Sequence, residues 1–177
     1  MRSKLFVPGS RPELFAKAAA SAADALSFDL EDAVAADRKT EARGAVAAFL
    51  RARPQDDRKI IVVRANGLSS GLFEDDLQAI VGPGLDILNL PMVESGEDVR
   101  KAARALARLE PAAGVERPIA ILANIETPKA LRLAADIAAA GQSAFYRAVP
   151  PPDAAAHSRP ALTPCFGHSS LFERGAP

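Results

Sequence analysis

Short apolar runs alternate with longer amphipathic segments from residue 4 to about residue 140. Parallel strands are covered on both faces and therefore have nearly continuous apolar sequences, whereas the helices that connect them carry one apolar stripe. The clearest apolar runs are Ile60-Ile-Val-Val63 and Ile119-Ala-Ile-Leu122. The alternation predicts an α/β fold with parallel strands over Lys4–Val7, Ala25–Leu30, Lys59–Arg64, Ile87–Leu90 and Ile119–Ile125.

Helix starts are predicted from residues that can bind unpaired backbone N–H groups. Ser10 with Glu13 has the spacing of a capping box, and Asp37 and Ser95 precede the next amphipathic segments. In Thr127-Pro128 a capping residue is followed by proline at the first helical position, where proline needs no hydrogen bond.

Two ways of closing the predicted sheet stay open at this point. Five β/α units in about 140 residues have the pace of a (β/α)₈ TIM barrel, but such a barrel has about 250 residues and eight units. The chain has 177 residues, which favours an open doubly wound sheet, yet no glycine-rich phosphate-binding fingerprint follows the first strand.

The composition changes after residue 140. The segment 141–177 holds both histidines, the only tyrosine and cysteine (Tyr146 and Cys165), no lysine, and Pro150, Pro151, Pro152, Pro160, Pro164 and Pro177. We therefore predict a partial (β/α) barrel domain over residues 1–140 and a divergent, irregular proline-rich tail over 141–177. A frameshifted or truncated coding sequence would explain such a tail.

Charge and sorting signals narrow the function classes. Lysine plus arginine equals aspartate plus glutamate at 22 each, so the chain has no general basic field for nucleic acid or anionic lipid. The N-terminus leads directly into a strand-like run and does not resemble a signal peptide. Cys165 is the single cysteine and cannot form an internal disulfide. These features predict a cytoplasmic protein with neither a nucleic-acid nor a membrane partner.

Polar residues follow each predicted strand, at the sheet edge where parallel α/β folds place their sites. The runs are Pro8-Gly9-Ser10-Arg11, Asp29-Leu-Glu31-Asp32, Arg64-Ala-Asn66-Gly67, Pro91-Met-Val-Glu94 and Asn124-Ile-Glu126-Thr127. Three of the five contain carboxylates, and the third begins with an arginine. Magnesium binds through one or two carboxylates plus substrate oxygens, and a guanidinium can hold a carboxylate with its planar fork. The pattern predicts a magnesium site that takes an anionic, oxygen-rich ligand.

Six runs, in order and at plausible spacing, resemble the signatures of the citrate lyase β-subunit (HpcH/HpaI aldolase) family. They are Arg2-Ser-Lys-Leu-Phe-Val-Pro-Gly9, Phe28-Asp-Leu-Glu-Asp-Ala-Val34, Lys39 with Ala42-Arg43, Val63-Arg-Ala-Asn-Gly67, Leu90-Pro-Met-Val-Glu-Ser95 and Ile125-Glu-Thr-Pro128. The resemblance implies a TIM barrel of which five of eight units are present. It also implies homo-oligomers, commonly trimers.

The activity implied by the resemblance is a magnesium-dependent carbon–carbon lyase. Such an enzyme cleaves a 3-hydroxy-acyl thioester of the citryl, malyl or citramalyl type into an acetyl thioester and a keto acid such as oxaloacetate, glyoxylate or pyruvate. The thioester carrier is CoA or an acyl-carrier group. By the same resemblance, Arg64 matches the arginine that binds the substrate carboxylate and Glu126 the glutamate that binds Mg²⁺ and faces the substrate. Glu31 and Asp32 match the acidic pair that lines the metal site through water.

The resemblance also implies that the carrier approaches Pro8, Gly9 and Arg11, and that Lys17 contacts its phosphates. For Arg11 and Lys17 the alternative of a solvated charge on a helix face stays open. The chain departs from the family pattern at Met92, where the family usually has lysine. It also lacks the second metal ligand, an aspartate in a Phe-Gly-x-x-Asp motif after strand six; Asp153 lies at a comparable distance but in a proline run.

Three interpretations therefore stay open. In the first, the chain is a thioester lyase whose activity is impaired because the last strands and the second metal ligand are absent. In the second, it is a non-catalytic truncated homologue or binding subunit. In the third, it is an aldolase that acts on free hydroxy-keto acids with the same metal and arginine.

Overall fold

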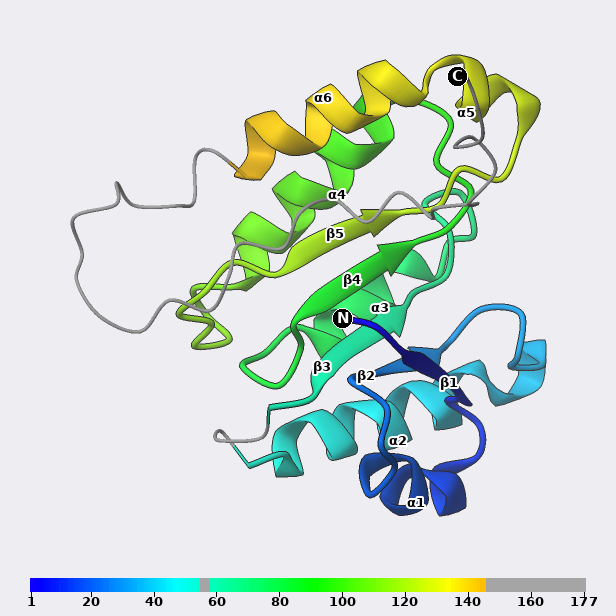
Figure 1. Cartoon of the computed structure of the whole chain (residues 1–177), viewed down its shortest axis with the longest axis vertical. Coiled ribbons are helices and arrows are strands. Elements are labelled where there is room, and N and C mark those ends of the chain that lie inside the picture. The colour runs from blue at the N-terminus through cyan, green and yellow to red at the C-terminus, as the bar shows by residue number, and fades with distance from the viewer. Residues whose placement is uncertain (55–57, 146–177) are drawn as a thin grey trace, which may run out of the picture.

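A computed structural model describes residues 1–54 and 58–145 of the chain as strands and helices that alternate around one parallel sheet (Figure 1). Hydrogen bonds join its five strands in the order β1-β2-β3-β4-β5. The elements, in chain order, are β1 (Lys4–Pro8), the 3₁₀ helix η1 (Pro12–Leu14), α1 (Phe15–Ala19), β2 (Ala25–Asp29), the 3₁₀ helix η2 (Ala36–Arg38), α2 (Lys39–Ala52), β3 (Ile60–Arg64), α3 (Phe73–Ile80), β4 (Ile87–Leu90), α4 (Gly96–Leu109), β5 (Ala120–Ala123), α5 (Pro128–Arg132) and α6 (Ala134–Phe145).

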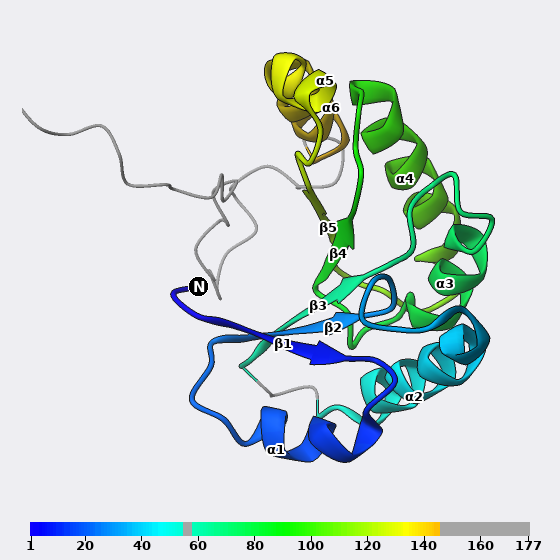
Figure 2. The same cartoon turned by 90° about the vertical axis from the view of Figure 1, so that its right-hand side faces the viewer.

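The sequential strand order distinguishes between the two predicted closures. A doubly wound sheet reverses its strand order at a switch point and places helices on both faces, whereas a barrel adds each strand beside the last. Figure 2 shows a curved sheet with α1, α2, α3 and α4 along its convex side. The predicted α/β fold with five parallel units of a TIM-barrel-like sheet is confirmed. β5 is shorter than predicted, because regular pairing ends at Ala123.

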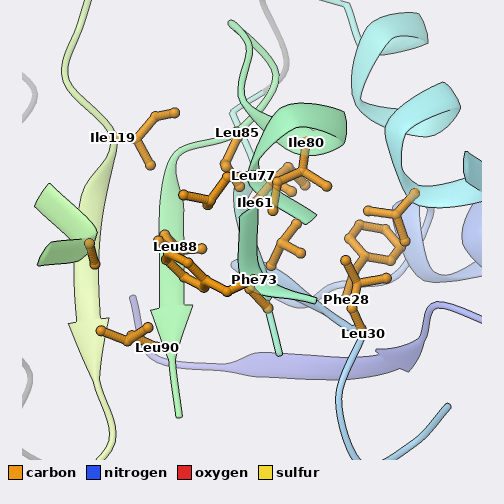
Figure 3. Close-up of a cluster of buried hydrophobic side chains, with 14 of the residues drawn as sticks. Phe28, Leu30, Ile61, Phe73, Leu77, Ile80, Leu85, Leu88, Leu90 and Ile119 are labelled. Atoms are coloured by element: carbon orange, nitrogen blue, oxygen red, sulfur yellow. The ribbon is translucent and has the colours of Figure 1, made fainter. Parts of the chain in front are cut away.

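The main core lies between the sheet and the helices on its convex side. Side chains alternate along each strand, so Phe28, Ile61 and Leu88 point toward the helices while their sequence neighbours point to the concave side. In Figure 3 Ile61 lies beside Leu77 and Ile80 of α3 and Leu88 lies on their other side. Phe28 packs instead against the rings of Phe15 and Phe49. Full burial of such side chains stabilises the fold by about 1.5–3 kcal/mol each.

The concave face of the sheet carries a row of residues that are register partners across three strand pairs. Asp29 on β2 pairs with Arg64 on β3, Arg64 pairs with Asn89 on β4, and Asn89 pairs with Leu122 on β5. Register partners in a parallel sheet point to the same face, because their strands are in phase. The fold therefore brings an acid, a guanidinium and an amide side by side at one level of this face.

Two predicted helix caps are confirmed. The Ser95 hydroxyl accepts a hydrogen bond from the backbone N–H of Asp98 at 3.2 Å, at the start of α4. The Thr127 hydroxyl accepts from the N–H of Ala130 at 3.0 Å, and Pro128 occupies the first turn of α5.

The two other predicted caps are wrong. The Ser10 hydroxyl lies 3.4 Å from the carbonyl oxygen of Ala33 and donates to it, so it is used by a distant loop and caps no helix. The residue before η1 is Arg11, which pairs with Glu13 in place of the predicted capping box. Asp37 lies inside η2, and α2 starts without a side-chain cap.

α6 extends past the predicted domain boundary at residue 140 and ends at Phe145. The predictions that concern Tyr146, Asp153 and Cys165 fall outside the described residues. Among residues 1–54 and 58–145, no helix combines the length and apolar character needed to cross a membrane.

Candidate functional site

Arg64 is the centre of the candidate site. Its Nε and Nη2 bind the two oxygens of Asp29 at 2.8 and 2.6 Å, a two-pronged contact between register partners. Its Nη1 contacts Glu31 at 3.0 Å and Asp32 at 3.2 Å, in the loop after β2. The Asp29 side chain is only 5% exposed, whereas that of Asp32 is 79% exposed. One guanidinium thus gathers three carboxylates, of which Asp29 is the most tightly held.

The loop after β2 is held in place from both sides. The Asp29 carboxylate accepts from the backbone N–H groups of Glu31 at 2.8 Å and Ala33 at 2.9 Å. The ammonium of Lys39 donates to the carbonyl oxygens of Leu30 at 2.7 Å and Glu31 at 2.6 Å. These contacts fix the backbone from which Glu31 and its neighbour project, so the acids are positioned before any ligand arrives.

The pKa values of three charged groups respond to this arrangement. Burial opposes ionisation of Asp29, but the hydrogen bonds from Arg64 and the backbone outweigh it and hold the pKa of Asp29 below its ordinary value. Burial raises the pKa of Glu31, and the negative charges of Asp32, Glu126 and Asp29 raise it further against the opposing effect of Arg64. The hydrogen bonds from Arg64 to Asp29 raise the pKa of the guanidinium.

Glu126 lies close enough to Glu31 for its charge to affect that residue, although it comes from the loop after β5. Its Oε2 accepts from the backbone N–H of Met92 at 2.8 Å, and its Oε1 accepts from the side-chain amide of Asn124 at 3.1 Å. Met92 has φ = 51°, in the left-handed region that residues other than glycine rarely adopt, and its side chain is exposed. The loops after β4 and β5 are therefore joined at the glutamate.

A second buried network supports the loop after β3. Asp76 of α3 accepts from the backbone N–H of Asn66 at 2.8 Å and from its side-chain amide at 2.6 Å. The other Asp76 oxygen accepts from Nε of Arg43 on α2 at 2.8 Å. Asn66 is two residues beyond Arg64, so this network fixes the backbone that carries the central guanidinium.

The predicted carrier-binding residues lie at the same edge of the sheet. Pro8 is the register partner of Asp29, and the Gly9 N–H donates to the Asp29 carbonyl oxygen at 2.8 Å. A Cβ on Gly9 would lie 2.8 Å from that oxygen, so only glycine fits without movement. Arg11 is exposed and paired with Glu13, and Lys17 is exposed on α1. No contact in the described residues connects Arg11 or Lys17 with Arg64.

The donors present are oxygens, which suits Mg²⁺. Asp29, Glu31 and Asp32 set three carboxylates around the Arg64 guanidinium, and Glu126 adds a further negative charge near Glu31. Even so, residues 1–54 and 58–145 contain no group of three or more acidic, histidine or cysteine side chains arranged to hold a metal ion. Three of the acids face Arg64, and Glu126 is held by the Met92 N–H.

The sequence placed Arg64, Glu31, Asp32 and Glu126 at one edge of the sheet, and the structure has them there. No site role was predicted from the sequence for Asp29, which is the main partner of Arg64. Asp29 and Arg64 are the last residues of successive strands, and this signal could have suggested their pairing. No comparable sequence signal pointed to the contact between the Met92 N–H and Glu126.

Comparison with known proteins relates this arrangement to a family. Residues 2–149 match the model of the family described as HpcH/HpaI aldolase/citrate lyase. The chain is 38% identical to citrate lyase subunit beta of Escherichia coli K12 over 142 residues, which cover 80% of this chain and 47% of that protein. It is 36% identical over 141 residues to L-malyl-CoA/beta-methylmalyl-CoA lyase of Cereibacter sphaeroides, covering 78% of this chain and 44% of that one.

Among solved structures, the citrate lyase beta subunit of Mycobacterium tuberculosis complexed with oxaloacetate and magnesium superposes with a TM-score of 0.56 at 37% identity, over 77% of this chain and 52% of that one. The protein CitE of the same organism in complex with magnesium, acetoacetate and coenzyme A gives a TM-score of 0.56 at 35% identity, over 77% and 44% of the two chains. The present chain spans about half the length of the curated relatives it matches.

Proposed function

The chain belongs to the HpcH/HpaI aldolase/citrate lyase family, and from this membership we propose that it carries the Mg²⁺ and keto-acid site of a carbon–carbon lyase acting on a 3-hydroxy-acyl thioester. The observation that carries the proposal is the convergence of Arg64, Glu31, Asp32 and Glu126 at the carboxyl edge of the sheet. Relatives crystallised with magnesium and oxaloacetate, or with magnesium and coenzyme A, support the ligand class.

Each residue has a distinct part in this proposal. Arg64 presents a fixed positive charge to the carboxylate of the keto acid, and Asp29 keeps the guanidinium in place from behind. Glu126 is the proposed direct ligand of Mg²⁺, and Glu31 and Asp32 contact the ion through water. When bound, Mg²⁺ supplies positive charge to the hydroxy-acid oxygens. Pro8, Gly9 and Arg11 line the edge where a CoA or acyl-carrier thioester would enter.

The reaction cleaves the bond between the hydroxyl-bearing carbon and the carbon next to the thioester carbonyl. A base takes the hydroxyl proton, the hydroxyl carbon becomes the keto carbon, and the bonding electrons pass into a thioester enolate that is then protonated. Glu31 is the proposed base, because its carboxylate contacts the Arg64 guanidinium at 3.0 Å and so lies beside a keto acid bound there. The products are an acetyl thioester and a keto acid.

Calorimetry with Mg²⁺ alone and then with oxaloacetate added separates the proposed roles. We expect Glu126→Gln to weaken Mg²⁺ binding by about tenfold or more, because a carboxylate contacts the ion directly. Arg64→Ala should mainly weaken oxaloacetate binding. Glu97→Gln is a matched control, because Glu97 is exposed on α4 and pairs with Arg100 and Arg104. Equal losses for both variants in both titrations would contradict the assignment.

Turnover distinguishes the proposed lyase from the two other interpretations. Malyl or citramalyl thioester is mixed with the chain under saturating Mg²⁺, and the released keto acid is followed. We expect slow cleavage that Arg64→Ala abolishes. Binding without cleavage would favour a non-catalytic subunit, and faster cleavage of free hydroxy-keto acids would favour an aldolase. Light scattering of the same sample tests the proposed homo-oligomer, a trimer.

A further inference from the structure

We propose that Asn89 is a specificity-determining residue that accepts a hydrogen bond from the hydroxyl group of the substrate, beside the carboxylate that Arg64 holds. This inference rests on the proposed function and extends it to a residue that the family signatures do not contain. A neutral amide oxygen can accept a hydrogen bond from a hydroxyl group without a change of charge.

Asn89 is buried without a partner for its side-chain oxygen. The residue is 2% exposed on β4, and its Oδ1 has no hydrogen bond in the described part of the chain. An unsatisfied buried acceptor destabilises a fold by about 1–3 kcal/mol, so such a group calls for a ligand or water that pairs with it.

The direction of the side chain follows from the strand register. Asn89 is the register partner of Arg64, so both point to the concave face, while Leu88 and Leu90 point into the core beneath the helices. Neighbouring parallel strands lie about 4.8 Å apart, so Asn89 is one strand away from Arg64 on the same face.

The ion pairs of Arg64 are all with acids of β2 and its following loop, and none involves Asn89. The guanidinium leans toward β2, where its partners are Asp29, Glu31 and Asp32. On the opposite side the row continues to Leu122, which offers no polar partner. Glu126 projects from the next loop. A hydroxy acid bound with its carboxylate at Arg64 and its oxygens toward Glu126 would therefore span the strand that carries Asn89, and its hydroxyl would lie beside the Asn89 amide.

Two dicarboxylates isolate the part of the binding affinity that comes from a hydroxyl group paired with this oxygen. L-malate carries a hydroxyl next to a carboxylate, and succinate has the same chain without it. A site that hydrogen-bonds a hydroxyl rejects the analogue that lacks it, because the buried acceptor is then left unpaired. The ratio of their dissociation constants is the quantity to measure, by calorimetry on the full chain under saturating MgCl₂.

We expect the unmodified chain to bind L-malate about tenfold more tightly than succinate, and Asn89→Leu to remove most of this preference while succinate binding changes by less than about twofold. Asn89→Ala repeats the test with a smaller side chain in case leucine disturbs the face. Ser27→Ala is the matched control, because Ser27 on β2 also has a buried hydroxyl without a partner but pairs in register with Val62, away from Arg64.

The outcomes separate this inference from the proposed function. Suppose that Arg64→Ala weakens the binding of both acids and that Asn89→Leu leaves the ratio of the malate and succinate dissociation constants unchanged. The role of Asn89 is then overturned, while the proposed keto-acid site stands. If Arg64→Ala changes the binding of neither acid, the proposed function fails. An equal loss of preference in Ser27→Ala would also overturn the role, since the effect would then come from the packing of the face.

Discussion

Replacement of Asp29 by asparagine is the most direct test of how the site is held together. The Asp29 carboxylate accepts four hydrogen bonds, two from Arg64 at 2.6 and 2.8 Å and two from backbone N–H groups at 2.8 and 2.9 Å. Asparagine would point an N–H₂ group at a donor in place of one oxygen and remove the charge. Removal of one partner of a buried ion pair destabilises a protein by about 3–5 kcal/mol.

The remaining acids reduce this effect. Glu31 and Asp32 still contact Arg64 in the variant, and the Arg64 side chain is 16% exposed, so its charge is not left entirely without compensation. We therefore expect Asp29→Asn to lower the free energy of unfolding by about 3 kcal/mol, at the low end of that range. Urea denaturation at neutral pH measures it, and the dependence on urea concentration should stay unchanged.

Asp32→Asn is the matched control, because it removes a carboxylate from the same guanidinium at an exposed position. Exposed ion pairs contribute about 0–1 kcal/mol, so this variant should lose less than about 1 kcal/mol. Equal losses for Asp29→Asn and Asp32→Asn would refute the reasoning, since burial would then have no bearing on the strength of the pair.

The pH dependence of stability provides a second test. The folded-state pKa of Asp29 lies below its ordinary value of 3.8. The contribution of Asp29 to the free energy of unfolding is therefore fully present above pH 3.8 and is lost as the pH falls through the lower, folded-state pKa. The stability difference between the unmodified chain and Asp29→Asn should therefore be constant near neutrality and shrink in acid titrations below about pH 3.8; a difference that grows there would contradict this. Gly9→Ala should lower the melting temperature by the equivalent of about 1–3 kcal/mol, because the added Cβ would meet the Asp29 carbonyl oxygen at 2.8 Å, and an unchanged melting temperature would show that the contact relaxes. Met92→Gly should raise the unfolding free energy by up to about 1 kcal/mol, because relief of the left-handed conformation outweighs the extra freedom of the unfolded chain while the N–H to Glu126 is kept; lower stability in urea would argue that the Met92 side chain contributes more than its exposure indicates.

Local sequence determined the strands and two of the helix starts. Ser95 and Thr127 cap their helices because the groups that each hydroxyl binds lie only three residues further along the chain. Ser10 and Asp37 have equally suitable side chains, yet neither is a cap. The Ser10 hydroxyl is used by the carbonyl of Ala33, which lies 23 residues away, and only the packing of two loops decides such a competition.

The sequence by itself determined which residues stand at the ends of the strands, and hence that Arg64, Glu31 and Glu126 share one edge of a parallel sheet. Tertiary structure decided how they are paired. The register of β2 against β3 gave Arg64 its closest partner in Asp29, and the approach of two loops joined the Met92 N–H to Glu126. The physical reason is that strand and helix formation depends on neighbours within a few residues, whereas these contacts join groups 34 or 35 residues apart that meet only when the sheet has assembled.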